Sequence, residues 1–547
     1  MQKVEHKLST WYNLYSNEKI IDVSFEYFIR DIDNLFPNNE FYKRPKATIQ
    51  GIEFDSLNQY GFSNLNLYTL LNVVDIFEEI NKVNGFFRKK AKILFSLDDD
   101  KLYPSVLKNS LIRYFKNQKH YVYGFDVQKI NQFIFQAAVD TLEFDFSIFI
   151  SYNAANKKYY LQIYKGRELL NLQQQEALID ALFVNKKHFM LHTALDVIVL
   201  NVNKIIDSKI KHVVSRYLNS DNKLDYYSNL SVYLMVEDNN FEYILERFFS
   251  QVNIKYSKLN PLLNKDLLST SSVIFWRWLR TANYKADLII IFDKNQNLKL
   301  VVKTKEGYVN LNNDEIAYLF INSQYLYWKQ NKLLEENKLF IPLNAASFVI
   351  QTLENYKINY KYEDQIQSAS NVLFAYNLGF SNSIDCKLNY DSIEFLINFC
   401  FMLWNYKENN NLFTFKYKKM NDITKFLYLH TYQIKKDVKN TAQIFEYIQN
   451  NPSAFGKYKV AKLKAINYEN DQVIYFFKLE LKAKHHYSEM YFTYNKLNDQ
   501  NEIKIETKTD LYKLNQLIEK IYIYHIQRKI IKKYLRLANK LNKAKDK

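Results

Sequence analysis

The sequence predicts an α/β protein of several domains, and three observations support this. Its 547 residues suggest about three or four domains. Hydrophobic residues make up 48% of the chain, which is enough to build that number of cores. Short apolar runs at 93–97, 148–150 and 288–292 are typical of buried strands, and a second strand is expected at 298–302. Ligands of α/β folds bind where strands end, so the loops after these strands are candidate sites.

The loop between the last two strands has the layout of a metal site. Asp293, Asn295 and Asn297 place oxygen-bearing side chains at every second position, and three such side chains can converge on one hard cation. Only Asp293 carries a charge, whereas a tight Mg²⁺ site normally has more than one carboxylate. We therefore expect neither a bound metal nor a cofactor.

Glycine content argues against the usual nucleotide-binding enzymes. The chain has only eight glycines, and they are widely scattered. Loops that cradle phosphate need glycine so that backbone N–H groups can approach the anion and adopt positive φ. Neither a G-x-G-x-x-G nor a G-x-x-x-x-G-K-[S/T] motif is present, which disfavours ordinary ATPases and dinucleotide enzymes.

Cysteine use and hydropathy favour a cytoplasmic protein. Two cysteines, Cys386 and Cys400, exclude a disulfide framework and a cysteine-based zinc site. The longest apolar run, 395–404, is too short to span a bilayer. The N-terminus lacks a basic region followed by an apolar block, so we expect no secretory signal and no membrane span.

The formal net charge is +17, and much of it lies near the end of the sequence. After Thr509 the apolar residues recur near helical spacing, which predicts one helix. Between 528 and 547 Asp546 is the only acidic residue. This segment could bind an acidic protein, a nucleic-acid backbone or an anionic membrane, or could be a solvated terminus. Its candidate binding residues are Arg528, Lys529, Lys532, Lys533, Arg536 and Lys540.

The stretch ADLIIIFDKNQNL resembles the metal loop of the α-D-phosphohexomutases, in the phosphoglucomutase/phosphomannomutase branch. That loop reads A-D-L-I-I-x-x-D-P-D-A-D-R. Asp293 matches its first metal-binding aspartate, and Asn295 and Asn297 fall on the other two. Upstream, IFISYNAANKKYYLQIYKG resembles the family's phosphoserine loop at 151–154. Ser151 takes the phosphoserine position in one alignment and Asn153 takes it in the other, so this choice stays open.

Other family loops can be traced in the same order along nearly the whole chain. Asp98, after the strand at 93–97, matches the aspartate of a D-S-R motif. Asn377 replaces a glutamate of the sugar-binding loop, which lies at 375–381. Lys482 takes the place of the arginine, and Lys484 that of the serine, in the C-terminal phosphate loop at 482–489.

The resemblance implies a four-domain fold, with three α/β domains and a smaller α+β domain. It places these domains at 1–195, 196–312, 313–435 and 436–527, followed by a basic helical extension at 528–547. Phosphoryl transfer needs a nucleophile, a metal and cationic clamps on the phosphate, and most of the matching positions here carry other residues. We therefore expect a non-catalytic structural or adaptor subunit of a larger cytoplasmic protein assembly. An active mutase with a rearranged site and a basic nucleic-acid-binding protein are the alternatives.

Overall fold

The computed structural model divides the chain into two compact units. The first is built from Met1–Ser215, and the second from Arg216–Ile366 together with Ser370–Lys547. The structure describes residues 2–35, 37–83, 90–98, 104–127, 130–153, 157–184, 189, 191, 195–215, 229–236, 239–258, 285–292, 298–366, 371–377, 379–382, 386, 388, 392–409, 412–423, 426–434, 441–470, 473–496, 500–509 and 516–545.

The first unit contains a mixed sheet with the strand order β1-β2-β6-β5-β3-β4-β8, and β7 pairs with β6. Its strands are β1 (Lys46–Thr48), β2 (Gly51–Phe54), β3 (Lys92–Leu97), β4 (Tyr121–Phe125), β5 (Phe146–Asn153), β6 (Lys158–Lys165), β7 (Glu168–Leu169) and β8 (Ile198–Leu200). Strands β5, β3, β4 and β8 run parallel, whereas β6 and β2 are antiparallel to their neighbours. Because β8 pairs with β4, the first sheet extends past the domain limit expected at residue 195.

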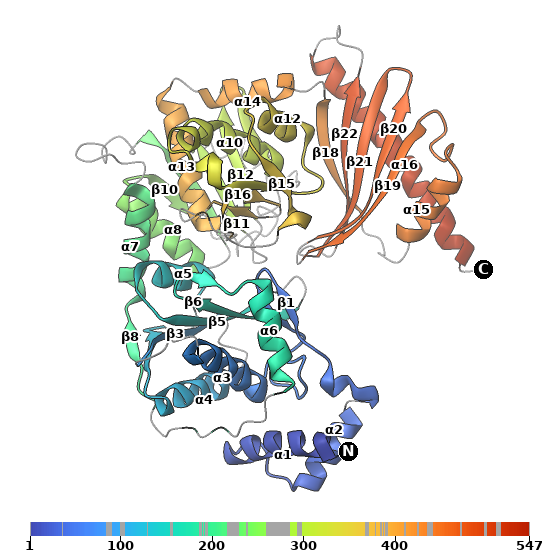
Figure 1. The fold of residues 1–547 in the computed structure, drawn as a ribbon. Helices are drawn as coiled ribbons and strands as arrows, with labels where there is room; N and C mark the ends of the chain where they lie inside the picture. The colour runs from blue at the N-terminus through green and yellow to red at the C-terminus, as the bar shows by residue number, and fades with distance from the viewer. Residues whose placement is uncertain are drawn as a thin grey trace. The chain divides into compact units, whose positions relative to one another are not determined.

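Helices pack on both faces of this sheet (Figure 1). Phe146, Ile148 and Ile150 of β5 share one core with α3, α4 and α6, while Phe149 stacks on Phe135 of α5 with ring centroids 4.6 Å apart. This alternation is the two-residue period of a strand buried on both faces. The helices are α1 (Gln2–Asn17), α2 (Phe25–Leu35), η1 (Pro37–Tyr42), α3 (Leu67–Val83), α4 (Pro104–Asn117), α5 (Gln132–Thr141), α6 (Leu172–Leu182) and α7 (Val202–Ser215).

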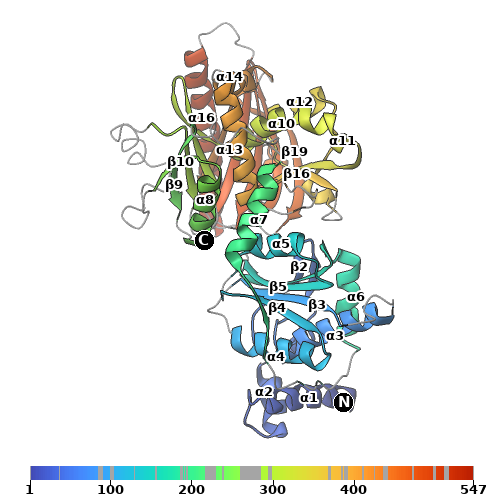
Figure 2. The same ribbon diagram turned by 90° about the vertical axis from the view of Figure 1, so that its left-hand side faces the viewer.

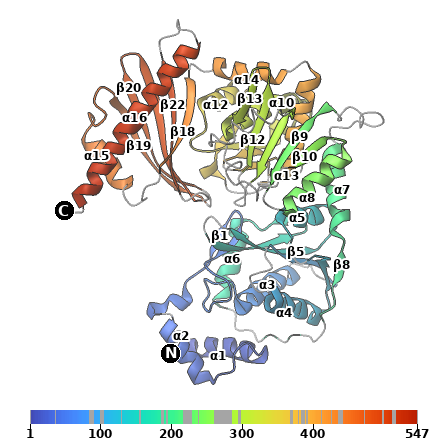
Figure 3. The ribbon, with the colours of Figure 1, turned by 180° about the vertical axis from the view of Figure 1, so that it is seen from behind.

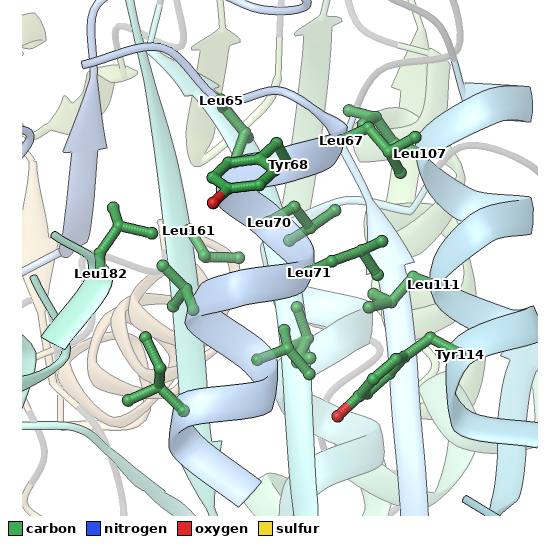
Figure 4. Packing of buried hydrophobic residues seen from close by; sticks show 14 of the residues in the cluster. Leu65, Leu67, Tyr68, Leu70, Leu71, Leu107, Leu111, Tyr114, Leu161 and Leu182 are labelled. Atoms are coloured by element: carbon green, nitrogen blue, oxygen red, sulfur yellow. The ribbon is translucent and has the colours of Figure 1, made fainter. Parts of the chain in front are cut away.

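Leucines from α3 and α4 form the centre of the larger core (Figure 4). Leu71 of α3 faces Leu111 of α4, and Leu161 of β6 and Leu182 of α6 line the same core. Leu71 is fully buried, so truncating it to alanine would cost about 2–5 kcal/mol of stability.

The second unit contains three sheets that follow one another along the chain. The second sheet has the order β10-β9-β11-β12-β13, and the third has the order β15-β14-β16-β17. Helix α8 lies beside β9 (Figure 2). The strands are β9 (Ser231–Val236), β10 (Lys255–Lys258), β11 (Leu288–Phe292), β12 (Leu298–Thr304), β13 (Gly307–Leu311), β14 (Lys338–Ile341), β15 (Tyr360–Tyr362), β16 (Val372–Tyr376) and β17 (Phe380–Ser381). The helices are α8 (Asn239–Gln251), α10 (Asn313–Gln330), α11 (Leu333–Glu336), α12 (Ser347–Asn355), η5 (Glu363–Gln365), α13 (Ser392–Glu408) and α14 (Leu412–Ile423).

The fourth sheet is antiparallel, with the order β18-β22-β21-β20-β19. Its strands are long: β18 (Phe426–Ile434), β19 (Lys459–Glu469), β20 (Val473–Ala483), β21 (His486–Asn495) and β22 (Gln500–Thr509). Two helices, α15 (Thr441–Asn450) and α16 (Gln516–Lys545), pack on one face of this sheet (Figure 3).

Helix α16 belongs to the core of the fourth sheet. It runs without a break across residue 528, where a separate basic extension was expected to begin. Ile526, before that limit, and Ile530 and Tyr534, beyond it, lie in the same apolar cluster as Phe492 of β21. The rings of Phe492 and Tyr534 are 4.8 Å apart. The boundary at 528 therefore does not separate two elements.

All four expected strands are present, and the α/β prediction is confirmed. The runs at 93–97, 148–150, 288–292 and 298–302 lie in β3, β5, β11 and β12. Across the described ranges, no helix is long and apolar enough to cross a membrane.

Candidate functional site

Polar residues gather at the carboxyl edge of the third sheet. Strands β15, β14 and β16 are parallel, so their carboxyl ends meet at one edge, where α/β folds bind ligands. Glu363 follows β15, Asn377 follows β16, and α12 begins at Ser347 after β14. Asn377 is also the residue that the sequence resemblance places in the sugar-binding loop. This edge is therefore the candidate site of the second unit.

The first turn of α12 attracts anions. Its N-cap residue is Ala346, which has no side chain that could accept a hydrogen bond from the free amides. Two carboxylates from elsewhere accept these hydrogen bonds. Asp314 Oδ1 accepts from the Ala346 N–H at 2.8 Å, and Glu506 Oε1 accepts from the Ser347 N–H at 3.0 Å. The protein's own carboxylates thus occupy the position at a helix N-terminus where a bound anion would sit.

Lys504 of β22 neutralises one of these acids. Its ammonium group lies 2.5 Å from Asp314 Oδ2 and also donates to the Asn344 carbonyl oxygen. Lys504 and Asp314 are only 7% and 6% exposed, so this is a buried ion pair that needs its additional hydrogen bonds. The Tyr376 hydroxyl supplies one of them, at 2.9 Å from Asp314 Oδ1. Burial and the charge of Asp314 raise the pKa of Tyr376 far above its ordinary value, so it remains a donor.

Asn377 is held by protein groups on both sides of its amide. Its Nδ2 donates to Glu363 Oε2 at 3.0 Å, and its Oδ1 accepts from the Tyr475 hydroxyl at 3.5 Å. Asn470 also donates to Glu363 Oε2, at 2.8 Å. Burial raises the pKa of Glu363 to about 7, although hydrogen bonds from Tyr475, the Leu343 N–H and Asn470 oppose the shift. The Asn377 amide, which the resemblance places in a sugar-binding loop, is already hydrogen-bonded within the protein.

Polar side chains of the fourth sheet reach this edge because successive side chains of a strand point to opposite faces of the sheet. Ile503 and Ile505 of β22 face α16, so Lys504 and the buried Glu506 point to the opposite face. Tyr475 would lie on the α16 side by simple alternation with Phe477. A β-bulge between these two residues turns it to the other face, opposite Thr493.

We call this set the edge network: Asp314, Ser347, Glu363, Tyr376, Asn377, Asn470, Tyr475, Lys504 and Glu506. Burial raises the pKa of Glu506 to about 7, while hydrogen bonds from Ser347 and the charge of Lys504 act against this shift. The network links the third sheet to the fourth through buried polar contacts. Ligand binding at this edge would require these contacts to open.

The expected C-terminal phosphate loop is a tight hairpin. Strand β20 ends at Ala483 and β21 begins at His486, so Lys484 and His485 form a two-residue turn. Lys482 lies within β20 opposite Tyr487, and the Lys482 and Lys484 side chains are exposed. A phosphate cradle needs several converging backbone N–H groups, which a two-residue turn does not supply.

In the first unit, three predicted residues lie at the ends of two neighbouring strands, β3 and β5. Ser151 and Asn153 are half-buried at the end of β5. Asp98 follows β3, and its N–H donates to the Ile150 carbonyl at 2.9 Å. The hydrogen bond to Ile150 therefore places Asp98 next to the strand end that carries Ser151. Ser151 and Asn153 both stay predicted counterparts of the phosphoserine.

Lys158, the lysine beside the predicted phosphoserine position, forms an ion pair with Asp55. Lys158 pairs with Asn153 across the β5–β6 ladder and forms an ion pair with Asp55. Lys43 forms a second ion pair with Asp55, at 2.6 Å. Burial opposes ionisation, but hydrogen bonds from Lys158 and Lys43 lower the pKa of Asp55. A phosphate on Ser151 would have to compete with Asp55 for Lys158.

The expected metal loop falls on residues outside the described ranges. These residues are Asp293, Asn295 and Asn297, which lie between β11 and β12. The expectation that they hold no tight metal stays a prediction. Among the residues that the structure describes, no group of three or more histidine, cysteine, aspartate or glutamate side chains could hold a metal ion.

Sequence reasoning missed most of the edge network. Lys504 and Glu506 alternate with isoleucines, a pattern that equally fits a strand with one solvated face. One local signal was present. A helix that begins after Ala346 with no capping side chain needs acceptors from elsewhere in the fold.

Comparison with known proteins shows the fold alone. No family model and no curated protein matches this sequence. Among solved structures, the chain is similar to a provisionally assigned phosphomannomutase from Thermus thermophilus, with a TM-score of 0.52 and 9% sequence identity. The match covers 88% of this chain and 100% of that one. The structure thus has a distant likeness to the phosphohexomutase fold.

Proposed function

We propose that this protein is a non-catalytic, phosphoglucomutase-like pseudoenzyme on a four-domain phosphohexomutase architecture. It serves as a structural or adaptor subunit of a larger cytoplasmic protein assembly and uses no cofactor. The observation that supports this proposal best is the edge network, in which Lys504 and Glu506 fill the edge where a sugar would bind.

A sugar phosphate at this edge would have to displace charged groups that are already satisfied. Removing Lys504 from Asp314 would leave a buried carboxylate without its counter-ion, which typically costs about 3–5 kcal/mol. Displacing Glu506 would also free the Ser347 amide of α12. A substrate would have to supply all these interactions again before any energy remained for catalysis.

The same contacts suit a structural role. The edge network joins residues at the edge of the third sheet to the fourth sheet through hydrogen bonds that involve Asn470, Lys504 and Glu506. Partly satisfied polar networks are costly, whereas fully satisfied ones rigidify a fold and specify one arrangement. A rigid frame of this kind presents fixed surfaces to neighbouring subunits.

The test is an activity assay beside an isolation experiment. Purified protein, with Mg²⁺ and the bisphosphate activator, should convert neither glucose 1-phosphate nor mannose 1-phosphate above a control without enzyme. The Thermus thermophilus protein, assayed in parallel, is the reference for the fold. Turnover of about 1 s⁻¹ or faster would place the protein among ordinary enzymes and defeat the proposal. Isolation from its native cells should recover stoichiometric partner proteins, and recovery of the chain alone would count against the structural role.

A further inference from the structure

The outer face of α16 carries a continuous row of basic side chains. Arg528, Lys529, Lys532, Arg536 and Lys540 are all exposed, and we call these five residues the basic ridge. At 100° per residue they fall within an arc of about 120°, and Arg528 and Lys540 are about 18 Å apart along the axis. Lys533 lies outside the ridge. It is half-buried and donates to the Phe455 carbonyl at 2.6 Å.

The helix holds the ridge in a fixed position. Ile530, Ile531, Tyr534 and Ala538 on its opposite face are buried against the fourth sheet. Gln527 adds a hydrogen bond to Thr507 Oγ1 at 3.2 Å. Binding at a preformed helix avoids most of the cost of ordering a flexible tail, so affinity lost to conformational entropy is small.

The ridge has no acidic neighbours along its own helix. Residues 520–545 contain no aspartate or glutamate. Within the described part of the chain, no carboxylate forms an ion pair with any of the five ridge residues. The positive charge is therefore available to a partner.

Residues beside the basic ridge favour a protein over a nucleic acid as its binding partner. Tyr522 and Tyr524, at the start of α16, are each 38% exposed, and the Arg528 guanidinium lies 5.3 Å from the centre of the Tyr524 ring. Tyrosine and arginine are the residue types enriched in protein interfaces. The residues Arg528, Lys532, Arg536 and Lys540 form a row at four-residue spacing, and rows of this kind are the ridges that helices use when they pack against one another.

We infer that the basic ridge docks an acidic helix of a partner subunit, with aspartate or glutamate at four-residue spacing. Both rows then repeat about every 6 Å, so successive charges can pair along the contact. This inference rests on the proposed function, because it names the kind of partner that the structural subunit would bind.

The test compares two charge-reversal variants of the full-length protein. The ridge variant is Lys532→Glu/Arg536→Glu/Lys540→Glu. The control is Lys459→Glu/Lys462→Glu/Lys464→Glu, which makes the same change in net charge on exposed residues of edge strand β19. Circular dichroism and thermal unfolding should show that both variants fold, since all six side chains are exposed.

Two probes measure binding at about 150 mM salt: a helical peptide with glutamate at every fourth position, and a 20-base-pair DNA duplex. The ridge variant should bind the peptide at least about tenfold more weakly than wild type, while the β19 control should change by less than about twofold. An equal loss of peptide affinity in both variants, or no loss of peptide affinity in either, would overturn the inference. Tighter binding of the duplex than of the peptide, lost in the ridge variant, would replace the acidic helix with a nucleic acid.

Isolation from native cells separates this inference from the proposed function. The ridge variant should lose partner proteins that the wild type and the β19 control retain. If all three proteins retain their partners, the ridge is not the docking surface, although the structural role stands. If the wild type itself recovers no partner, the structural role fails and the ridge inference fails with it.

Discussion

Replacing Lys504 by methionine is the sharpest test of the edge network. Methionine preserves most of the side-chain volume but removes the ammonium that pairs with Asp314 and donates to the Asn344 carbonyl. Among the described residues, Ala346 and Tyr376 would remain as the hydrogen-bond donors to Asp314. A buried carboxylate with neutral donors alone is poorly compensated.

The structure sets the size of the effect. At the 2.5 Å separation of the Lys504 and Asp314 charges, and an effective dielectric constant near 20, their attraction is about 7 kcal/mol. Part of this is offset because the lysine no longer has to be desolvated in the fold. The expected net loss is about 3–5 kcal/mol. Adding Asp314→Asn removes the stranded charge, so the double variant should recover a large share of this loss.

Urea unfolding measures the change in the free energy of unfolding. Hydrogen exchange of peptides that cover α12 shows whether the loss of stability is located at that helix. The matched control is Lys508→Met on the same strand, where the lysine is half-buried. The control should lose less than about 1 kcal/mol, and its α12 amides should keep their protection. A loss below about 1 kcal/mol in Lys504→Met itself would mean that the ion pair does not hold the third and fourth sheets together.

Three further predictions follow from the fold and the site. Burial gives Glu506 a pKa of about 7 in the folded state against a reference value of 4.5, so the folded state binds more protons between these values. Stability should therefore fall as pH rises from about 4.5 to 7, and Glu506→Gln should remove up to about 1.4 kcal/mol per pH unit of that slope, as measured by urea unfolding at several pH values. Deleting 528–547 should unfold the fourth sheet, because it removes Ile530 and Tyr534 from the core; a deletion protein with native circular dichroism would contradict this. Calorimetry with millimolar Mg²⁺ should show no saturable binding, because Asp293 is the only carboxylate of its loop, and a micromolar site would show that other acids complete the shell.

The strands could be predicted from the sequence because their signal is local. Runs such as 288–292 are apolar at every position, which suits a strand covered on both faces. The amphipathic spacing of α16 was visible too, and Ile526 and Ile530 continue it across 528. The boundary at 528 follows from the end of the family resemblance, whereas the apolar pattern continues across it.

The edge network could not be predicted because its partners are far apart in the chain. Lys504 and Asp314 are 190 residues apart, and Glu506 and Ser347 are 159 apart. No spacing rule links such pairs, and the charged residues of β22 have the period of any half-exposed strand. Asn377 was identified through the resemblance, but only the structure shows that its amide is bound by Glu363 and Tyr475.

The absence of a capping side chain at Ala346 has a consequence for synthesis on the ribosome. The carboxylate that accepts from the Ser347 amide belongs to a residue made 159 positions later. At about 5–20 residues per second, Ser347 leaves the ribosome roughly 8–30 s before Glu506 does. During that interval Asp314 can accept from the Ala346 N–H, but the Ser347 N–H lacks its Glu506 acceptor and is open to water and to free anions. The hydrogen bonds at the start of α12 are complete only after Glu506 of β22 has been translated.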